Sequence, residues 1–334
     1  MTIAIRPAGP GDIDRMTVLL LRDAEVRYAH DPVLWAMAPA PRAAITDTLR
    51  RAMGEDPGPV RQTWLVAVSG AEVVGTIHAI LLPVPPIYAG AEGAPGLIME
   101  DSIVAAGAPD GTGRKLLEAA ERDLAEAGAR ILLGASVPGG AFERVLTAAG
   151  YTPLTLYYAK SGLDGVAGDT VRAAAEADVR AIVELSAQNR RILHAIDRFW
   201  RPHAEADARF DGWMRKSLTL GDRDMLVADP EGAVEGYAIA QPAGPLHIPP
   251  AHDIRATGFI DDFYHLDLAD TAALQDEGHG AAGLLGAAEA ALAARGKGAA
   301  LVVCPAGWAS KRALLEAAGY EVALEWHMRR LPRP

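Results

Sequence analysis

The chain has little cysteine, few aromatic residues and no excess of positive charge, and these shortages exclude several classes of protein. Its 334 residues include one cysteine, Cys304, which excludes an internal disulfide and a cysteine metal cluster. Asp and Glu outnumber Lys and Arg by 43 to 32. The net charge of −11 argues against non-specific binding to nucleic acid, which depends on cations that neutralise phosphates. We therefore expect a cytoplasmic protein with no nucleic-acid partner.

The sequence also lacks an uninterrupted apolar run. Its best candidate, residues 281–304, is broken by Glu289, Arg295 and Lys297, so we expect no membrane span and no membrane partner. Residues 1–6 have the pattern of a strand rather than that of a signal peptide. The remaining composition, 50% hydrophobic and 22% charged, is that of an ordinary globular protein. Two domains are the usual outcome at this length.

What the chain does have is an internal repeat. Four segments recur in the same order: 146–151 as 315–320, 5–7 with Asp12 as 171–173 with Asp178, 65–67 as 226–228, and 117–121 as 285–289. Four collinear matches indicate a duplicated domain, because the period is far too long for a solenoid. Residues 161–169 are rich in Gly and Asp and are expected to be the linker. The predicted domains are therefore 1–160 and 170–334, which we call the first and the second half.

Each half gives the same coarse pattern of elements. The expected order is a strand, a helix (12–27 or 178–194), a hairpin (65–80 or 226–240), a central strand (96–104 or 258–265), a glycine loop with a helix (114–127 or 282–294), an apolar strand (131–135 or 299–303), a short helix and a closing strand. Mixed order of this kind predicts a layered α/β or α+β domain. The Pro/Gly-rich segments 83–95 and 241–250 are expected to be loops that form variable binding surfaces.

The sharpest local signal is the loop 109–113, which places Gly111 and Gly113 directly before a helix. Glycines let the backbone turn tightly and leave its N–H groups open to a ligand. The helix start adds unpaired donors and the positive end of a dipole. Together they suit a pyrophosphate, although a simple helix-capping turn has the same pattern.

The order of elements, the glycine loop and the Ala-Gly-Tyr corner at 149–151 resemble the GNAT acetyltransferase superfamily. That family's coenzyme A loop reads Arg/Gln-x-x-Gly-x-Gly/Ala; Gly111 and Gly113 match its small positions, and Ala108 stands where Arg or Gln is expected. The resemblance implies an α/β fold with a mixed sheet and two GNAT-like acyl-CoA N-acyltransferase domains in tandem, similar in architecture to mycothiol synthase. The coenzyme-binding residues it implies are Ile103, Val104, Gly111, Thr112, Gly113 and Arg114 in the first half, and Gly278, Gly280 and Ala281 in the second.

The second glycine loop is less regular than the first. It carries Asp276 and Glu277 near the expected pyrophosphate, its register is ambiguous, and residues 266–274 lengthen the approach to it. Negative charge there is electrostatically unfavourable. We therefore expect the first half to be the better acetyl-CoA site.

Acyl transfer to an amine requires that the protein hold the acceptor and remove its proton. The resemblance implies a carboxylate on the central strand as the base, and the candidates are Glu100, Asp101, Asp261 and Asp262. Because neighbouring strand residues point to opposite faces, we expect one of each pair to reach the cleft. His265 is a further candidate base. Each of these residues has a purely structural role as its alternative.

Two other features bear on the chemistry. The tyrosine that many family members carry four residues before the corner glycine, as the acid to the leaving thiolate, is replaced by Leu146 and Leu315. Aromatic clusters at 30–35 and 197–202 are expected to form either an acceptor wall or packing between helices and halves.

The sequence therefore predicts an acetyl-CoA-dependent N-acetyltransferase that acts by direct transfer on the amine of a small molecule. The alternatives are a non-catalytic acyl-CoA-binding protein and a protein N-acetyltransferase. The sequence leaves the acceptor and the oligomeric state open.

Overall fold

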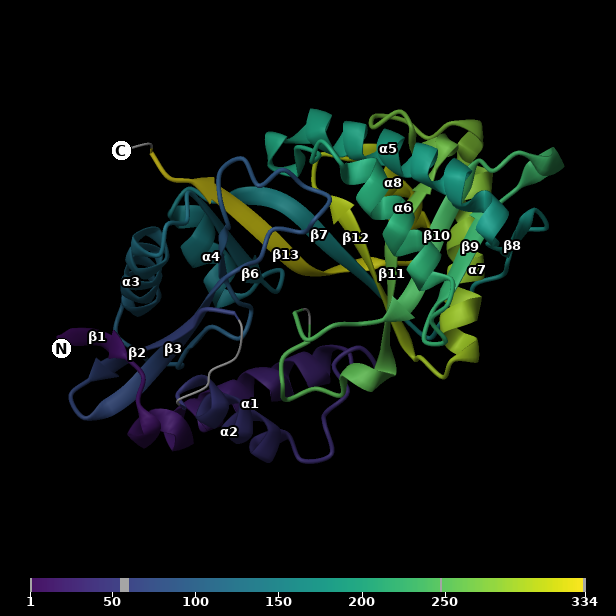
Figure 1. The fold of residues 1–334 in the computed structure, drawn as a ribbon. Coiled ribbons are helices and arrows are strands. Elements are labelled where there is room, and N and C mark those ends of the chain that lie inside the picture. The colour runs from purple at the N-terminus through teal and green to yellow at the C-terminus, as the bar shows by residue number, and fades with distance from the viewer. Residues whose placement is uncertain (1, 55–59, 247, 333–334) are drawn as a thin grey trace.

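The computed structural model describes residues 2–54, 60–246 and 248–332 and gives both halves the same order of elements (Figure 1). The first half contains β1 (Ile3–Pro7), α1 (Ile13–His30), α2 (Pro41–Ala52), β2 (Gln62–Ser69), β3 (Glu72–Leu81), β4 (Gly96–Ile98), β5 (Ile103–Val104), α3 (Thr112–Glu126), β6 (Ile131–Ser136), α4 (Ala141–Ala148) and β7 (Thr152–Ser161). The second half contains β8 (Val171–Ala173), α5 (Val179–Ile196), α6 (Ala206–Ser217), β9 (Asp224–Ala228), β10 (Gly236–Pro242), β11 (Thr257–His265), α7 (His279–Ala294), β12 (Ala299–Pro305), α8 (Ala309–Ala317) and β13 (Glu321–Arg330). Met1, in the first expected strand, and His247, in the second expected loop, lie outside the described residues.

The repeated segments build the same local structures in both halves. Arg6 forms a bidentate pair with Asp12 at 2.7 and 2.8 Å, and Arg172 pairs with Asp178 at 2.7 and 2.9 Å. In each half the aspartate also accepts a hydrogen bond from a backbone N–H three residues earlier, at the turn that leads into the first helix. The Arg and the Asp that recur six positions apart in each half therefore build the same structural corner twice.

The second repeated corner ends the short helices α4 and α8. Gly150 and Gly319 adopt φ values of +84° and +83°, in the left-handed region that favours glycine. The next residue turns back, so that the N–H of Tyr151 donates to the carbonyl of Leu146 at 3.1 Å. The tyrosine of the second half makes the equivalent bond at 3.0 Å. This is the usual glycine-terminated end of a helix.

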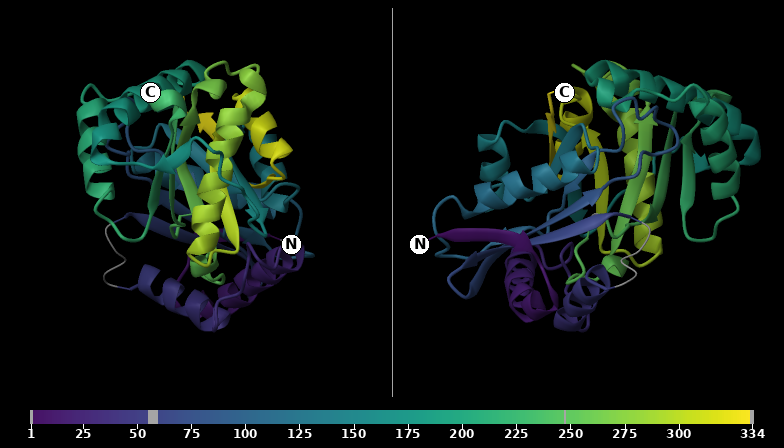
Figure 2. Two further views of the ribbon diagram at one scale, coloured as in Figure 1. Left: turned by 90° about the vertical axis from the view of Figure 1, so that its right-hand side faces the viewer. Right: turned by 60° about the vertical axis from the view of Figure 1, so that its left-hand side comes forward.

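The strands of both halves form one continuous sheet in which the closing strands have exchanged places (Figures 1 and 2). The order is β1-β2-β3-β4-β6-β13-β7-β12-β11-β10-β9-β8, with β5 on β3. The closing strand of the second half, β13, pairs with β6 of the first, and β7 pairs with β12. The two closing strands also pair with each other at the centre. Nothing in the sequence pattern indicated this exchange.

Helices cover both faces of the sheet. In the second half α5 and α6 lie over one face and α7 over the other (Figure 2). The core between the halves is shared, since one apolar cluster joins Leu133 and Tyr157 of the first half to Leu301 and Trp326 of the second. None of the helices in the described ranges combines the length and apolarity needed to cross a bilayer.

The linker expected at 161–169 lies against α7. The N–H of Gly168 donates to the carbonyl of Gly283 at 3.2 Å, and a Cβ on Gly286 would overlap the backbone of Val166. Glycines on the helix thus permit a close approach of two backbones. The boundaries 1–160, 161–169 and 170–334 stay a prediction.

Each half sends a loop across the central strand of the other (Figure 1). From the first half, residues 83–95 reach the segment after α5, where the N–H of His203 donates to the carbonyl of Ile87 at 2.9 Å. From the second half, residues 241–256 reach the segment after α1, where the N–H of Ala38 donates to the carbonyl of Ala251 at 2.9 Å. Both acid pairs are therefore covered by residues of the opposite half.

Candidate active site

The glycine loop of the first half leads directly into α3. Gly111, just before the helix, has a φ of +79°, a value that favours glycine. A Cβ on Gly113 would lie 2.9 Å from the side chain of Val145, so this glycine lets α3 and α4 approach each other. Within the described ranges, the amides of Gly113 and Arg114 donate no hydrogen bond. The helix start thus offers free donors and its positive dipole end to an anion.

A cavity of about 610 Å³ opens at this helix start, between α3 and α4. Its lining combines the two glycines with three arginines, two glutamates and apolar side chains: Gly111, Gly113, Arg114, Leu117, Glu118, Glu121, Ala141, Arg144, Val145, Ala148, Ala149 and Arg329. Arg114 pairs with Glu118 at 2.8 Å and Arg329 with Glu121 at 2.9 Å. Arg144 forms no ion pair with any described residue.

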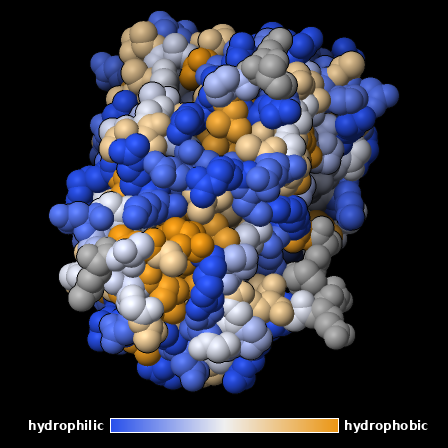
Figure 3. Space-filling model, turned by 90° about the vertical axis from the view of Figure 1, so that its left-hand side faces the viewer, coloured by the Kyte–Doolittle hydropathy of each residue, from blue (hydrophilic) through white to orange (hydrophobic). Residues whose placement is uncertain are grey.

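The arginines and the apolar wall of this cavity suit a phosphate group joined to a less polar chain. Arg329 belongs to β13, so the exchange of closing strands delivers a cation of the second half to a cavity of the first. The face on which α3 lies also shows hydrophobic surface set among hydrophilic side chains (Figure 3). Sequence reasoning missed Arg144 and Arg329, because neither lies in the glycine loop.

Three of the expected coenzyme-binding residues, Ile103, Val104 and Thr112, support the glycine loop. The hydroxyl of Thr112 donates to the carbonyl of Pro109 at 2.6 Å and holds the loop. Ile103 and Val104 form β5, which pairs with β3, and neither is among the residues that line the cavity. Val104 lies behind Gly113, 3.5 Å from where a Cβ would stand. These residues shape the loop from behind.

The central strand of the first half is interrupted, which corrects the expectation of one strand over 96–104. β4 ends at Ile98 and β5 begins at Ile103, with a turn between them in which the N–H of Ser102 donates to the carbonyl of Met99 at 3.2 Å. The parallel pairing of β4 with β6 ends at Ile98 and Gly134. The two strands therefore separate where the acid pair begins.

Glu100 lies in this turn and is buried, with 5% of its surface exposed. Its Oε2 has no hydrogen-bond partner among the described residues, and the guanidinium of Arg27 donates to the backbone carbonyl of Glu100. Burial, with the neighbouring Asp101 as the second cause, raises the pKa of Glu100 to about 8. A carboxyl group that exchanges its proton near neutral pH suits general-base chemistry.

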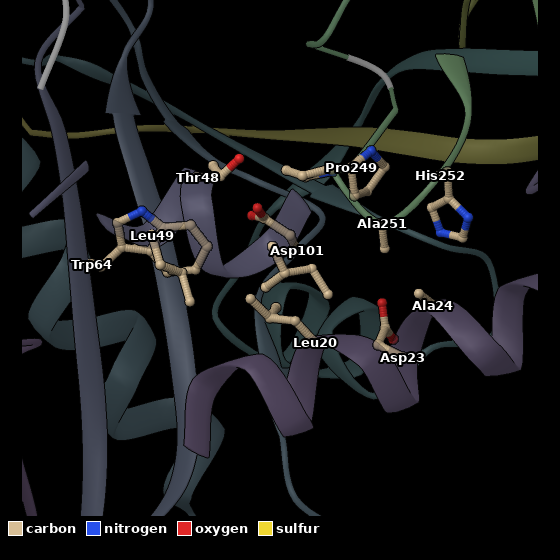
Figure 4. A pocket seen from close by; sticks show the side chains of 12 residues that line it. Leu20, Asp23, Ala24, Thr48, Leu49, Trp64, Asp101, Pro249, Ala251 and His252 are labelled. Atoms are coloured by element: carbon tan, nitrogen blue, oxygen red, sulfur yellow. The ribbon is translucent and has the colours of Figure 1, made fainter. Parts of the chain in front are cut away.

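Asp101 points to the other side, into a small cavity of about 20 Å³ between α1, α2 and the loop from the second half. Figure 4 shows it between Leu20 and Asp23 of α1 and Pro249 of the crossing loop. Its Oδ1 lies 3.0 Å from Nδ1 of His78 on β3. The cavity has room for about one water molecule, so this acid site is tightly packed. Sequence reasoning missed the histidine, which carries no motif.

The equivalent helix start in the second half is closed. The N–H of Ala281 donates to Oδ2 of Asp267 at 3.0 Å, so an internal carboxylate occupies a donor expected to bind the coenzyme. Asp267 in turn donates its own N–H to Nδ1 of His265 at 3.1 Å. A Cβ on Gly280 would overlap the ring of His265, while Gly278 turns the loop with a φ of +74°.

This arrangement bears on two of the expected site residues, which stay predictions. The amide of Ala281 already donates to Asp267, and the ring of His265 packs against Gly280 at the helix start. Burial lowers the pKa of His265, so its imidazole is held neutral in a packing position. Asp267 lies in the segment 266–274 that lengthens this half, but nothing in its sequence indicated contact with the helix.

Asp261 and Asp262 both face one cavity of about 440 Å³. The expectation that only one of the pair reaches the cleft is wrong for this half. The pairing of β11 with β10 shifts register between Tyr237 and Ile239, and Asp262 has a φ of +49°. An extra residue of this kind is a β-bulge, which turns two successive side chains to one face.

Hydrogen bonds hold both carboxylates. Asp261 accepts from Nε2 of Gln241 and Asp262 from Nδ2 of Asn189, each at 3.1 Å. Burial, with Asp262 as the second cause, raises the pKa of Asp261 to about 6. Lys311 also lines the cavity, but its ammonium donates to the carbonyl of Phe263 at 2.8 Å.

The two aromatic clusters have different roles. Trp35 is 2% exposed and packs in the shared core, with its ring 5.2 Å from that of His252. Trp200 lines the cavity over Asp261 and Asp262. Leu146 and Leu315, which replace the family's tyrosine, are fully buried core residues. Cys304 is buried.

Comparisons with known proteins bear on the fold. No family model matches the sequence, and no curated protein matches it. The chain is similar to a GCN5-related N-acetyltransferase from Sphaerobacter thermophilus, with 16% identity, a TM-score of 0.57, and coverage of 99% of this chain and 96% of that one. A tandem GNAT protein from the clavulanic acid biosynthesis pathway aligns over 100% of both chains with 15% identity and a TM-score of 0.49. The whole chain therefore has the fold of a GCN5-related N-acetyltransferase, which confirms the expected fold class.

Proposed function

We propose that the protein transfers an acetyl group from acetyl-CoA to the amine of a small molecule, and that the first half performs the transfer. The observation that carries this proposal is the open start of α3, where free amides and three arginines surround a cavity of about 610 Å³. The similarity of the whole chain to a GCN5-related N-acetyltransferase supports the reaction class. The single, buried cysteine supports a reducing, cytoplasmic setting.

The residues of the first half have separate tasks in this proposal. The amides of Gly113 and Arg114 and the guanidinium groups of Arg114, Arg144 and Arg329 hold the phosphates of the coenzyme in this proposal. The acceptor nitrogen attacks the thioester carbonyl, its proton passes to a carboxylate, and the coenzyme leaves as the thiolate. Glu100 is the proposed base; because burial raises its pKa to about 8, it can accept the proton once the pH reaches that range.

Charge reversal at the helix start tests coenzyme binding without disturbing the core. Gly113→Trp and Gly280→Trp would be poor tests of coenzyme binding, because a Cβ at either position would overlap a packed side chain. Arg114 is exposed and pairs with Glu118 four residues on, and Arg180 at the start of α5 is exposed and pairs with Glu184 in the same way. Arg180→Glu is therefore a matched control for Arg114→Glu.

We expect calorimetry to give one acetyl-CoA per chain and Arg114→Glu to weaken binding roughly tenfold or more, since a charge-assisted hydrogen bond contributes about 1.5–3 kcal/mol. Arg180→Glu should bind as the wild type does. Thiol release with a panel of amines then measures turnover. Binding without turnover would favour the non-catalytic acyl-CoA-binding alternative, and turnover with peptides alone would favour a protein acetyltransferase. Equal loss in both arginine variants would contradict the assignment to the first half.

A further inference from the structure

We propose that the cavity over Asp261 and Asp262 binds an organic ammonium ion with an apolar body and does not acetylate it. The cavity has a volume of about 440 Å³, which is in the range of sites that enclose small molecules. Its counterpart in the first half, at Asp101, has about 20 Å³. This proposal goes beyond the acetyl transfer assigned to the first half and does not depend on it.

The acceptors of the cavity, the two carboxylates of Asp261 and Asp262 and one amide oxygen, form no ion pair with any described residue. Asn189 also lines the cavity and is 4% exposed. Its Nδ2 donates to Asp262, which leaves its buried Oδ1 without a hydrogen-bond partner among the described residues. A buried acceptor without a partner is unfavourable in the empty site. A ligand that brings several N–H donors and a positive charge would satisfy all three side chains.

The cations at the cavity wall are engaged elsewhere. Lys311 donates to the backbone carbonyl of Phe263 at 2.8 Å. Arg209 donates to the carbonyl of Pro86 at 2.8 Å and to Glu205 at 2.7 Å. They therefore leave the inner carboxylates available to a cationic ligand.

The remaining wall is mainly apolar and contains four aromatic side chains: Tyr88 from the crossing loop of the first half, and Trp200, Phe210 and Trp213 of the second. Aliphatic and proline side chains such as Ile87, Leu193 and Val303 complete it. Aromatic faces attract cations and bury the apolar part of a ligand. A second cavity of about 820 Å³ shares Tyr88, Thr155, Trp200 and Val303 with the first, so a longer ligand can continue between the halves. A primary amine on an aromatic or aliphatic body fits this arrangement.

The closed start of α7 explains why the bound amine is not consumed. Asp267 occupies the amide of Ala281 with a buried carboxylate, and a pyrophosphate at the same donors would meet that negative charge. The second half thus keeps an amine pocket without a coenzyme site.

The proposal is tested by binding without acetyl-CoA, with phenethylamine and hexylamine as probes and 2-phenylethanol as the uncharged counterpart. Calorimetry and the fluorescence of Trp200 and Trp213 report binding. We expect both amines to bind at least tenfold more tightly than the alcohol. Asp262→Asn should weaken phenethylamine by about 10- to 100-fold, and asparagine tolerates the left-handed backbone at this position. Asp211→Asn, on α6 but outside the cavity lining, should leave binding unchanged.

Several results would overturn the proposal. Equal affinity for phenethylamine and 2-phenylethanol would show that the cavity does not recognise the ammonium group. If neither amine binds at millimolar concentration, the cavity is not an amine-binding site. Unchanged affinity in both Asp261→Asn and Asp262→Asn would place the amine elsewhere. If acetyl-CoA is added and the amine is acetylated at a rate that falls in Asp262→Asn but not in Asp101→Asn, the cavity is a second catalytic site.

Discussion

The helix after the glycine loop begins with a left-handed glycine in both halves, Gly111 and Gly278, yet only one of the two helix starts is free. In α3 the first amides face a cavity with three arginines, whereas in α7 the amide of Ala281 donates to Asp267. A carboxylate and a pyrophosphate compete for the same donors and the same dipole. The comparison shows how one side chain from an inserted segment can replace a ligand while the backbone keeps its shape.

The cavities at the two acid pairs also differ in size, but here the more open one belongs to the second half. The first half, with the open helix start, packs Asp101 into a cavity of about 20 Å³ and buries Glu100. The second half, with the closed helix start, opens a cavity of about 440 Å³ over its acid pair. This contrast matches the two proposals, which place acetyl transfer in the first half and the binding of an amine that is not acetylated in the second.

The largest expected effect is a dependence of the free energy of unfolding on pH, caused by Glu100. Its ordinary pKa of 4.5 rises to about 8 in the folded protein, so between these values the folded state holds a proton that the unfolded state has lost. Stability should therefore fall as the pH rises through this window. We expect the wild type to lose roughly 4–5 kcal/mol relative to Glu100→Gln across it, at 1.36 kcal/mol for each pKa unit.

Urea denaturation of both proteins between pH 5 and pH 9 measures that difference. Asp261→Asn serves as the comparison in the second half, where the pKa rises only to about 6 and the window is narrower. A stability difference between wild type and Glu100→Gln that does not change with pH would show that Glu100 is hydrated when folded.

The next expected effect is on the rate of acetyl transfer, which should fall in a variant of the first half but not in a variant of the second. Glu100→Gln is expected to lower the rate of acetyl transfer by roughly 10²–10³, as the loss of a general base does. The wild-type rate should increase as the pH rises through about 8, where Glu100 loses its proton, and the variant should lose that increase. Asp262→Asn should retain wild-type turnover. If steady-state kinetics show the same loss in both variants, the proposed division between the halves is wrong.

The closed helix start gives a smaller effect. Asp267→Asn removes a buried, charge-assisted hydrogen bond and is expected to lower the free energy of unfolding by roughly 1–3 kcal/mol. Asp110, in the first glycine loop, is exposed and accepts no hydrogen bond from any described residue. Asp110→Asn should therefore stay within about 0.5 kcal/mol of the wild type. Urea denaturation compares them, and equal effects would mean that Asp267 is not holding α7.

The smallest effect lies in the repeated corner. Arg6→Met and Arg172→Met each remove a half-exposed ion pair, which contributes roughly 0.2–1 kcal/mol. Arg172→Met should lower the free energy of unfolding by more than Arg6→Met does, because Arg172 also pairs with Asp229 at 2.6 Å. Thermal unfolding at low and high salt measures this, since salt should reduce both effects. A larger loss at Arg6 would show that the two corners are not equivalent.

Much of the fold could be predicted, because the repeated segments carry local physics. The pairing of Arg6 with Asp12 and the helix end at Gly150 depend on residues a few positions apart, so their recurrence at Arg172 and Gly319 was visible in the sequence. The glycine loop before α3 is local in the same way. The alternation rule failed at Asp262, because a β-bulge depends on the register with a neighbouring strand and not on the strand's own pattern.

The duplication, the order of elements in each half, and the positions of the glycine loops and acid pairs could all be read from local patterns in the sequence. Which closing strand completes which half, and with it the presence of Arg329 in the cavity that Gly113 also lines, depends on long-range packing. Backbone hydrogen bonds join a strand to either partner equally well, so the apolar pattern of β7 and β13 does not specify the exchange. The contact of Asp267 with Ala281 has the same origin: it spans fourteen positions and is fixed by how the inserted segment packs.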